Sequence, residues 1–154
     1  MKNTTNAPHD EFHNSWTSKV IDCITKIWNK SINLPEKISE SCNCIANKWG
    51  KFHEISVTIN YEGSSYSNSK FTKSKTCVIQ NIDINKNIEG EIIIFFNSIN
   101  NDDEITNDEH TTISLLGALL SGFISQHRLL KYQNEYNERL KELNPEIIIE
   151  RNAT

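Results

Sequence analysis

The segment 107–143 places the strongest limit on how this chain can fold. It contains no proline, and Thr106 with Glu109 three residues later matches a capping box at its start. At 1.5 Å per residue, one helix over this segment would be on the order of 50 Å long. That is longer than a domain of 154 residues needs. We therefore expect a single long helix over 107–143, ended by Pro145 and followed by a frayed tail over 144–154.

Two shorter helices are predicted near the N-terminus, after a polar and disordered lead over residues 1–10. Pro35 fits the first turn of the second helix, which ends near Trp49. We expect Trp49 to pack where this helix meets the strands, beside Ile45 and Phe52. The first helix is indicated by apolar residues that recur every three or four positions. These residues are Phe12, Trp16, Val20, Cys23, Ile24, Ile27 and Trp28.

Four strands are predicted between the second helix and the long one. Residues 54–61 alternate apolar and polar side chains, and Glu62-Gly63 provides a turn into a short strand over 64–69. Residues 76–84 form a strand with mixed faces, and after a turn 88–96 is the most apolar strand. A strand that is apolar throughout belongs at the centre of a sheet. The order helix, helix, antiparallel strands, helix predicts an α+β domain.

Size and charge bound the class of protein. A chain of 154 residues fits one domain with a core of useful size. Its net charge of −4 argues against a nucleic-acid partner, because a phosphate-binding face needs clustered Lys and Arg. The N-terminus has no apolar segment typical of a secretory signal, and the apolar runs 92–96 and 113–124 are too short or too interrupted to span a bilayer. We therefore expect a cytoplasmic protein with no membrane partner.

The cysteines do not indicate a metal site. The chain has four, and their spacing with the histidines fits no zinc motif. Cys42 and Cys44 are two apart on a predicted helix, so they point to different sides. We expect all four, which are Cys23, Cys42, Cys44 and Cys77, to be reduced thiols packed as small hydrophobes.

Landmark residues run through the predicted strands in a set order. A Trp follows a helix, a strand ends in Tyr-x-Gly, a Phe-Thr pair comes next, and a glycine starts an apolar strand. An acidic loop then leads to a Glu and an apolar helix. These landmarks are Trp49, Ile55, Ile59, Tyr61, Gly63, Tyr66, Phe71, Thr72, Ile82, the run from Gly90 to Phe96, and Glu109. This order, over about residues 20–143, resembles the GAF-like sensory domains that precede output modules in prokaryotic signal-transduction histidine kinases.

The resemblance implies a GAF-like domain over residues 11–143 with a regulatory or sensory role in signal transduction. No kinase domain follows in this sequence, so a histidine kinase or response regulator would act as a partner in trans, or the chain would be a truncated remnant. The loop 99–105 has only Asn and acidic residues between its flanking isoleucines, and no binding residue is carried over from the family. No cysteine or histidine is placed for attachment of a tetrapyrrole, so we expect no cofactor.

Catalytic chemistry is not indicated. The chain has no P-loop and no GxGxxG, and Gly63-Ser64-Ser65 lacks the flanks of a nucleophile elbow. His127 lies on the long helix, where kinases phosphorylate a histidine. A phospho-acceptor box has an acid after the histidine, whereas Arg128 and Leu129 follow here. We expect no enzyme, with the alternatives of an interaction adaptor without a ligand or a small-molecule enzyme fragment. The histidines are His9, His13, His53, His110 and His127.

A ligand pocket is predicted between the sheet and its covering loops. GAF-like sheets often hold a small molecule there, and the aromatic residues after the first strand fit its walls. They fit core and rim positions equally well. The predicted pocket residues are Tyr61, Tyr66, Phe71 and Thr72.

Self-association is predicted from the long helix. Between Ile113 and Ile124 it is apolar nearly all round, which is typical of a helix buried on both sides. Small residues such as Gly117 would let a partner approach closely, and steps of three and four residues give a heptad-like seam. A helix that packs only on its own domain would leave the stretch 132–143 without a purpose. We therefore predict a parallel homodimer through Ile113, Leu116, Leu120, Phe123, Leu130, Leu140 and Leu143.

Overall fold

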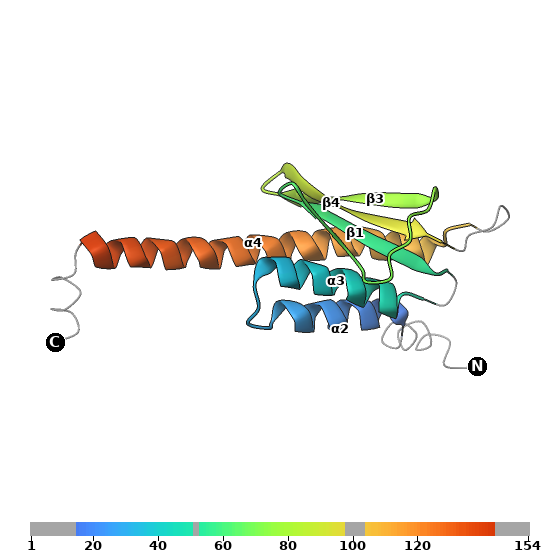
Figure 1. Cartoon of the computed structure of the whole chain (residues 1–154), viewed down its shortest axis with the longest axis horizontal. Coiled ribbons are helices and arrows are strands. Elements are labelled where there is room, and N and C mark those ends of the chain that lie inside the picture. The colour runs from blue at the N-terminus through green and yellow to red at the C-terminus, as the bar shows by residue number, and fades with distance from the viewer. Residues whose placement is uncertain (1–14, 51–52, 98–103, 144–154) are drawn as a thin grey trace, which may run out of the picture. The chain divides into compact units, whose positions relative to one another are not determined.

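The computed structural model describes residues 15–50, 53–97 and 104–143 (Figure 1). The predicted lead 1–10 and tail 144–154 lie outside these residues. The elements are α2 (Trp16–Trp28), α3 (Leu34–Lys48), β1 (Ile55–Tyr61), β2 (Ser64–Ser67), β3 (Cys77–Ile84), β4 (Asn87–Phe96) and α4 (Asn107–Leu143). The chain divides into two compact units, 1–121 and 122–154. The predicted α+β class, with an antiparallel sheet and a long helix 107–143, is confirmed.

Local signals fix the ends of the two N-terminal helices. Ser15 Oγ accepts a hydrogen bond from the Ser18 backbone N–H at the start of α2. Asn33 Oδ1 accepts from the Glu36 N–H at 2.9 Å at the start of α3, where Pro35 occupies the first turn. The two helices lie side by side as a hairpin (Figure 1). Phe12, the first of the apolar residues that indicate the first helix, lies outside the described residues.

The sheet has the strand order β2-β1-β4-β3, and all pairs are antiparallel. β1 and β4 pair from Ile55↔Phe96 to Tyr61↔Gly90, so β4 is central as predicted. In this register one face is a continuous apolar layer that faces the helices. Its fully or almost fully buried members include Ile55, Val57, Ile59, Ile92, Ile94 and Phe96.

Two tight turns connect the strand pairs. Glu62 and Gly63 have φ of 50° and 76°, and Asn85 and Lys86 have φ of 53° and 69°. Two successive residues with positive φ are the signature of type I′ turns, whose twist matches that of the flanking strands. Both turns were predicted from the sequence, and both are confirmed.

Two glycines allow backbone and helix to approach closely within the first unit. A Cβ at Gly90 would lie 2.5 Å from Asn60 O in the neighbouring strand. A Cβ at Gly117 would lie 2.5 Å from Gln80 Cγ and 3.2 Å from Asn81 O. Gly117 therefore lets α4 pack closely on its own β3, rather than on a partner as predicted.

Gly90→Ala is expected to destabilise the domain by about 1–3 kcal/mol, because the new methyl group meets a backbone carbonyl that cannot move freely. Urea unfolding followed by far-UV circular dichroism measures this change. Gly122→Ala is the matched control, since nothing lies within 4 Å of its Cβ position. On a helix that change is expected to stabilise by about 0.5–1 kcal/mol. Equal effects at both sites would contradict the close packing at Gly90.

The long helix contains one stretch that passes a simple test for a membrane span. By length and composition, α4 is long and apolar enough to cross a bilayer. A core helix of a soluble protein passes the same test, so this single helix is weak evidence for a membrane. The expectation that the chain has no membrane partner therefore stays a prediction.

The expectation of four reduced cysteines is wrong for two of them. Cys23 and Cys44 form a disulfide between α2 and α3, whereas Cys42 and Cys77 are free. The predicted opposite directions of Cys42 and Cys44 are confirmed. Cys42 Sγ lies 3.5 Å from Tyr66 O of the sheet, while Cys44 faces α2.

Candidate functional site

Three segments far apart in the sequence meet at the N-terminal turn of α4. Trp49 ends α3, His53 lies just before β1, and Glu109 lies in the first turn of α4. All three residues are buried, and Glu109 is only 1% exposed. A buried carboxylate is costly unless donors surround it. The contacts of Glu109 therefore define this junction.

The Glu109 carboxylate accepts hydrogen bonds from two other segments. Trp49 Nε1–H donates to Oε2 at 2.9 Å, and His53 Nδ1 lies 2.9 Å from Oε1 and 3.0 Å from Oε2. An ionised carboxylate has no proton to donate, so His53 Nδ1 carries the proton of this bond. The contact becomes a buried ion pair when the imidazole is protonated.

The same carboxylate closes the capping box that the sequence predicts. Thr106 N–H donates to Glu109 Oε1 at 3.0 Å, and Glu109 N–H donates to Thr106 Oγ1 at 3.1 Å. Burial acts to raise the pKa of Glu109, but hydrogen bonds from the Thr106 backbone, His53 and Trp49 outweigh it and hold the pKa below its ordinary value. Glu109 is therefore ionised at neutral pH.

Aromatic rings enclose the His53–Glu109 pair. The ring centroids of Trp16 and Trp49 are 4.5 Å apart. The Phe96 ring packs edge-on against both Trp49 and His53, at 6.5 Å and 5.5 Å between centroids. These rings shield the carboxylate from water, which strengthens its hydrogen bonds.

Trp49 lies where the second helix meets the sheet, as predicted. Its ring packs on Trp16 of α2 and on Phe96 of β4. Phe52, one of its expected neighbours, lies outside the described residues. Trp49 therefore links α2, the sheet and α4, in addition to ending α3.

A pair of threonines ties α2 to α4 beside this cluster. Thr112 Oγ1 donates to Asp108 O at 2.7 Å, so it accepts the hydrogen bond from Thr17 Oγ1 at 2.8 Å. Both threonines are buried. The first turns of α4 are thus held by α2, by the end of α3 and by the segment before β1.

The chemistry of this junction is structural and electrostatic. The His53 and Glu109 side chains are enclosed, so a substrate cannot reach them without local opening. No group of three His, Cys, Asp or Glu side chains suited to a metal ion occurs among the residues that the structure describes. What the junction can do is couple the position of α4 to the charge on one carboxylate.

The four predicted pocket residues do not line one cavity. Tyr61 is two residues after Ile59 on β1, so both side chains point to the helix side of the sheet. Tyr66 pairs with Ile59 across the strands and therefore lies on the same side. The other two lie on the opposite face. Phe71 packs edge-on against Phe95 at 5.4 Å, and Thr72 N–H donates to Ser56 Oγ at 2.9 Å. The segment that carries them crosses the face of the sheet turned away from the helices.

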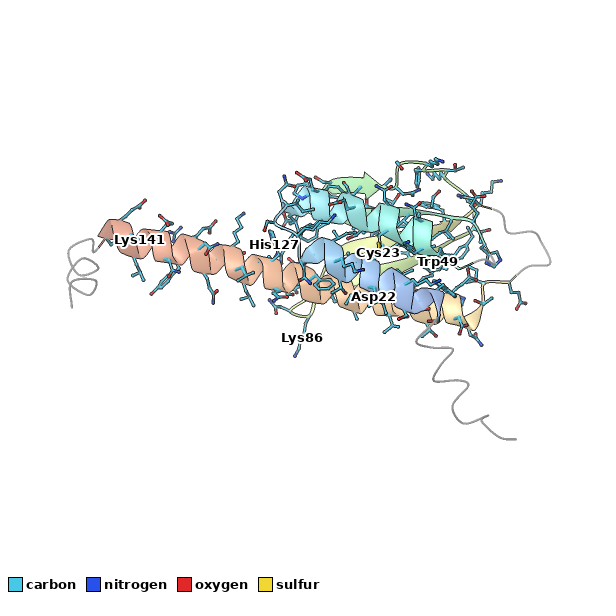
Figure 2. All side chains as sticks on the ribbon, turned by 90° about the horizontal axis from the view of Figure 1, so that it is seen from below. Asp22, Cys23, Trp49, Lys86, His127 and Lys141 are labelled. Atoms are coloured by element: carbon cyan, nitrogen blue, oxygen red, sulfur yellow. A yellow bond between two sulfur atoms is a disulfide. The ribbon has the colours of Figure 1, made fainter. Side chains whose placement is uncertain are left out.

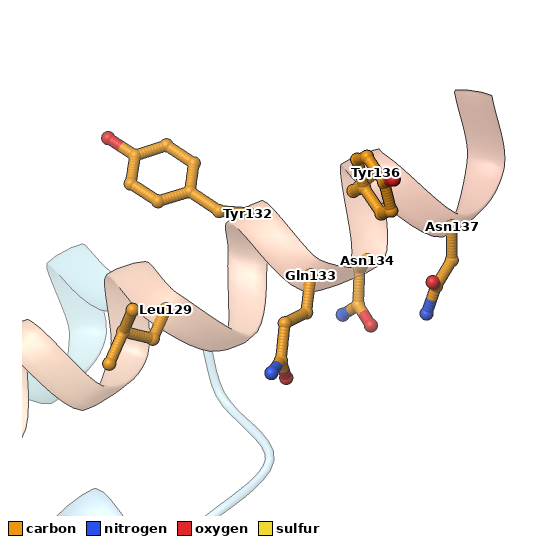
Figure 3. Close-up of a pocket in the computed structure, with 6 residues that line it drawn as sticks. All are labelled: Leu129, Tyr132, Gln133, Asn134, Tyr136 and Asn137. Carbon is orange, nitrogen blue, oxygen red and sulfur yellow. The ribbon is translucent and has the colours of Figure 1, made fainter. Parts of the chain in front are cut away.

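Two hollows on the described surface are open rather than enclosed. One, of about 210 Å³, lies at the β1–β2 turn and is lined by residues 60–63 and 88–91, including Tyr61. The other, of about 620 Å³, lies along residues 129–137 of α4. Figure 3 shows that its lining side chains all come from one helix, with Tyr132 on one side and Asn134 on another. Neither hollow has the enclosing walls of a small-molecule site.

The predicted dimer residues fall into two groups. Ile113, Leu116 and Leu120 are at most 1% exposed and belong to the core of the first unit, so they cannot meet a second copy. This part of the predicted interface is corrected. Phe123 is half-buried, whereas Leu130, Leu140 and Leu143 are 56%, 38% and 76% exposed.

The sequence contained only a partial signal for the junction. Spacing predicts a capping role for Glu109, whereas no local pattern distinguishes His53 from the other four histidines. The Trp49–Glu109 contact joins residues 60 positions apart, so no local pattern reveals it.

The comparisons with known proteins support the fold. A solved structure described as the GAF domain of A. Aeolicus nlh2 in an inactive state matches 73% of this chain and 97% of its own, with a TM-score of 0.50 and 19% identity. No family model and no curated protein matches the sequence. At 19% identity the likeness bears on the fold alone. The chain therefore has a GAF-like α+β fold.

Proposed function

We propose that this chain is a non-catalytic sensory or regulatory module in signal transduction, which passes a conformational bias through α4. The observation that carries the proposal is a GAF-like fold that ends in one 37-residue helix. The first turns of that helix are tied to three other segments by Glu109 and Thr112. A change in those segments therefore bears directly on α4.

Self-association through the end of α4 is part of this proposal. Every residue from 129 to 143 is exposed, and several are large and apolar. Leu129, Tyr136 and Leu143 are seven residues apart, and Leu140 falls between the last two at heptad spacing. An isolated helical tail with this composition is marginal in water. A second copy that packs on this seam would stabilise it.

The exposed end of α4 is also the surface through which we expect a signalling partner to bind. A histidine kinase or a response regulator would meet the module in trans, through the paired α4 helices. The alternative is an adaptor that binds a protein partner and senses no ligand. The cytoplasm is the compartment in which either role would be carried out.

Leu140→Glu with Leu143→Glu is expected to weaken a homodimer and leave the fold intact, because both side chains are exposed in the single chain. Burial of each leucine at an interface contributes roughly 1.5–3 kcal/mol, so the pair is expected to raise the dimer dissociation constant by at least about 100-fold. Sedimentation at tens of micromolar, with far-UV circular dichroism, measures both properties.

The matched control is Asn134→Glu with Lys141→Gln, which changes the net charge by the same amount at positions outside the heptad seam. It is expected to sediment as the wild type does. A monomeric wild-type protein under these conditions would refute the dimer, and equal weakening by both variants would refute the seam.

A further inference from the structure

A disulfide joins the two helices that lead to the candidate site. Cys23 of α2 and Cys44 of α3 are bonded across a sequence separation of 21, with 6.1 Å between their Cα atoms. This Cα separation is usual for disulfides. Figure 2 labels Cys23 where α2 runs beside α3. The same two helices are also joined by a hydrogen bond, in which Trp28 Nε1–H donates to Ser41 Oγ at 3.0 Å.

The two sulfur atoms differ in access from solvent. Cys44 is 4% exposed, whereas Cys23 is only half-buried. A thiolate that attacks a disulfide must reach one sulfur in line with the bond. Attack therefore occurs at Cys23, and Cys44 is the leaving group.

The two free cysteines are poorly placed to reshuffle this bond. Burial raises the pKa of Cys42 to about 12, so its thiol is protonated at neutral pH. Its sulfur also faces the sheet, on the other side of α3 from Cys44. Cys77 pairs with Phe95 on the sheet face turned away from the helices. Opening the bond therefore requires a thiol from outside the chain.

We propose that Cys23 and Cys44 form a thiol–disulfide switch, opened and closed by an external dithiol or its disulfide, that sets how firmly α2 holds the first turns of α4. The role of this switch as an input to a sensory module rests on the proposed function. The bond and its mechanical effect are tested independently of it. In a reducing compartment a disulfide of this kind is transient and serves redox sensing, and in an oxidising one it is permanent.

The chemistry balances without another reactant. One thiolate of the external dithiol bonds to Cys23 Sγ, the Cys23–Cys44 bond breaks, and the Cys44 thiolate takes a proton. The second thiol then attacks the mixed disulfide, Cys23 leaves as a thiolate that is protonated in turn, and the reagent departs as its own disulfide. Two electrons and two protons pass to the protein, and the reverse sequence closes the bond.

The path from this bond to α4 runs along α2. Cys23 lies on the same helix as Trp16, whose ring packs at a tilt against Trp49. Thr17, also on α2, donates to Thr112 of α4. When the bond is closed, α2 is covalently fixed to α3. When it is open, only packing and hydrogen bonds keep α2 beside α3, and the Thr17–Thr112 contact loosens with it.

The test compares the full chain after oxidation and after treatment with dithiothreitol. Alkylation with iodoacetamide and mass mapping is expected to modify Cys23 and Cys44 only in the reduced protein. Reduction is expected to lower Tm by roughly 5–12 °C. Hydrogen exchange is expected to become faster in the first turns of α4 as well as in α2. Sedimentation of both forms tests the proposed dimer separately.

Cys23→Ser with Cys44→Ser is expected to match the reduced wild type in both conditions, and Cys77→Ser is the control that should switch as the wild type does. Alkylation of Cys23 and Cys44 in the oxidised protein would overturn the bond. A fall in Tm on reduction with unchanged exchange in α4 would show a plain structural staple and overturn the switch.

Discussion

Replacing Trp49 with alanine is expected to destabilise the domain by about 3–5 kcal/mol. The side chain is 8% exposed, and its ring fills the space between Trp16 and Phe96. Its removal leaves a cavity among three elements that no neighbour can fill without moving. It also removes the Nε1–H donor from Glu109, a hydrogen bond to a charged group that is worth about 1.5–3 kcal/mol.

Urea unfolding followed by far-UV circular dichroism measures this loss, since a fluorescence signal would change with the tryptophan itself. Trp49→Phe separates the two contributions, because it keeps an aromatic ring and removes the donor. Tyr132→Ala, at a residue that is 60% exposed, is expected to change the free energy of unfolding by no more than about 0.5 kcal/mol. A loss below about 1 kcal/mol for Trp49→Ala would show that Trp49 does not organise the junction.

Local patterns predicted the elements of this fold well. Positions 55, 57, 59 and 61 alternate apolar side chains, so β1 and its inward face follow from the period of a strand. Positive-φ turns at Glu62-Gly63 and Asn85-Lys86 follow from turn chemistry. The capping box at Thr106 follows from spacing alone, because its partners are three residues apart.

Which face of α4 packs on its own domain could not be predicted in the same way. Between Ile113 and Ile124 the helix is apolar nearly all round, so periodicity does not distinguish an intramolecular face from an intermolecular one. Gly117 was interpreted as a point of approach for a partner, but it lies beside Leu116 on the inner face, where a side chain would collide with β3.

The contacts of the candidate site depend on tertiary packing. Cys23 and Cys44 face each other because of the way α2 and α3 pack, and helix spacing alone does not give that register. The separation of Tyr61 from Phe71 depends on the path of the segment after β2, which crosses to the other face of the sheet. The four predicted pocket residues are close in sequence, but they lie on opposite faces of the sheet.

Glu109→Gln is expected to lower the free energy of unfolding by about 3 kcal/mol or more at neutral pH. Gln has almost the same shape, but its amide places a donor against Trp49 Nε1–H or His53 Nδ1–H, and it carries no charge to stabilise them. Urea unfolding of both proteins measures the difference. Glu104→Gln, at an exposed carboxylate near the same helix end, is expected to change stability by no more than about 0.5 kcal/mol.

The difference between wild type and Glu109→Gln is also expected to depend on pH. The pKa of Glu109 is lower in the folded protein than its ordinary value of about 4.3, so the unfolded chain binds the proton more readily. The stabilisation is therefore fully present above about pH 4.3 and is lost as pH falls through the lower, folded-state pKa. Unfolding curves at a series of pH values should bring the two proteins together on the acid side, where the wild type also carries a neutral carboxyl group. A difference that stayed constant over that range would mean that shape, and not the charge on Glu109, holds α4 at the junction, and the coupling of α4 to a single carboxylate would then have to be abandoned.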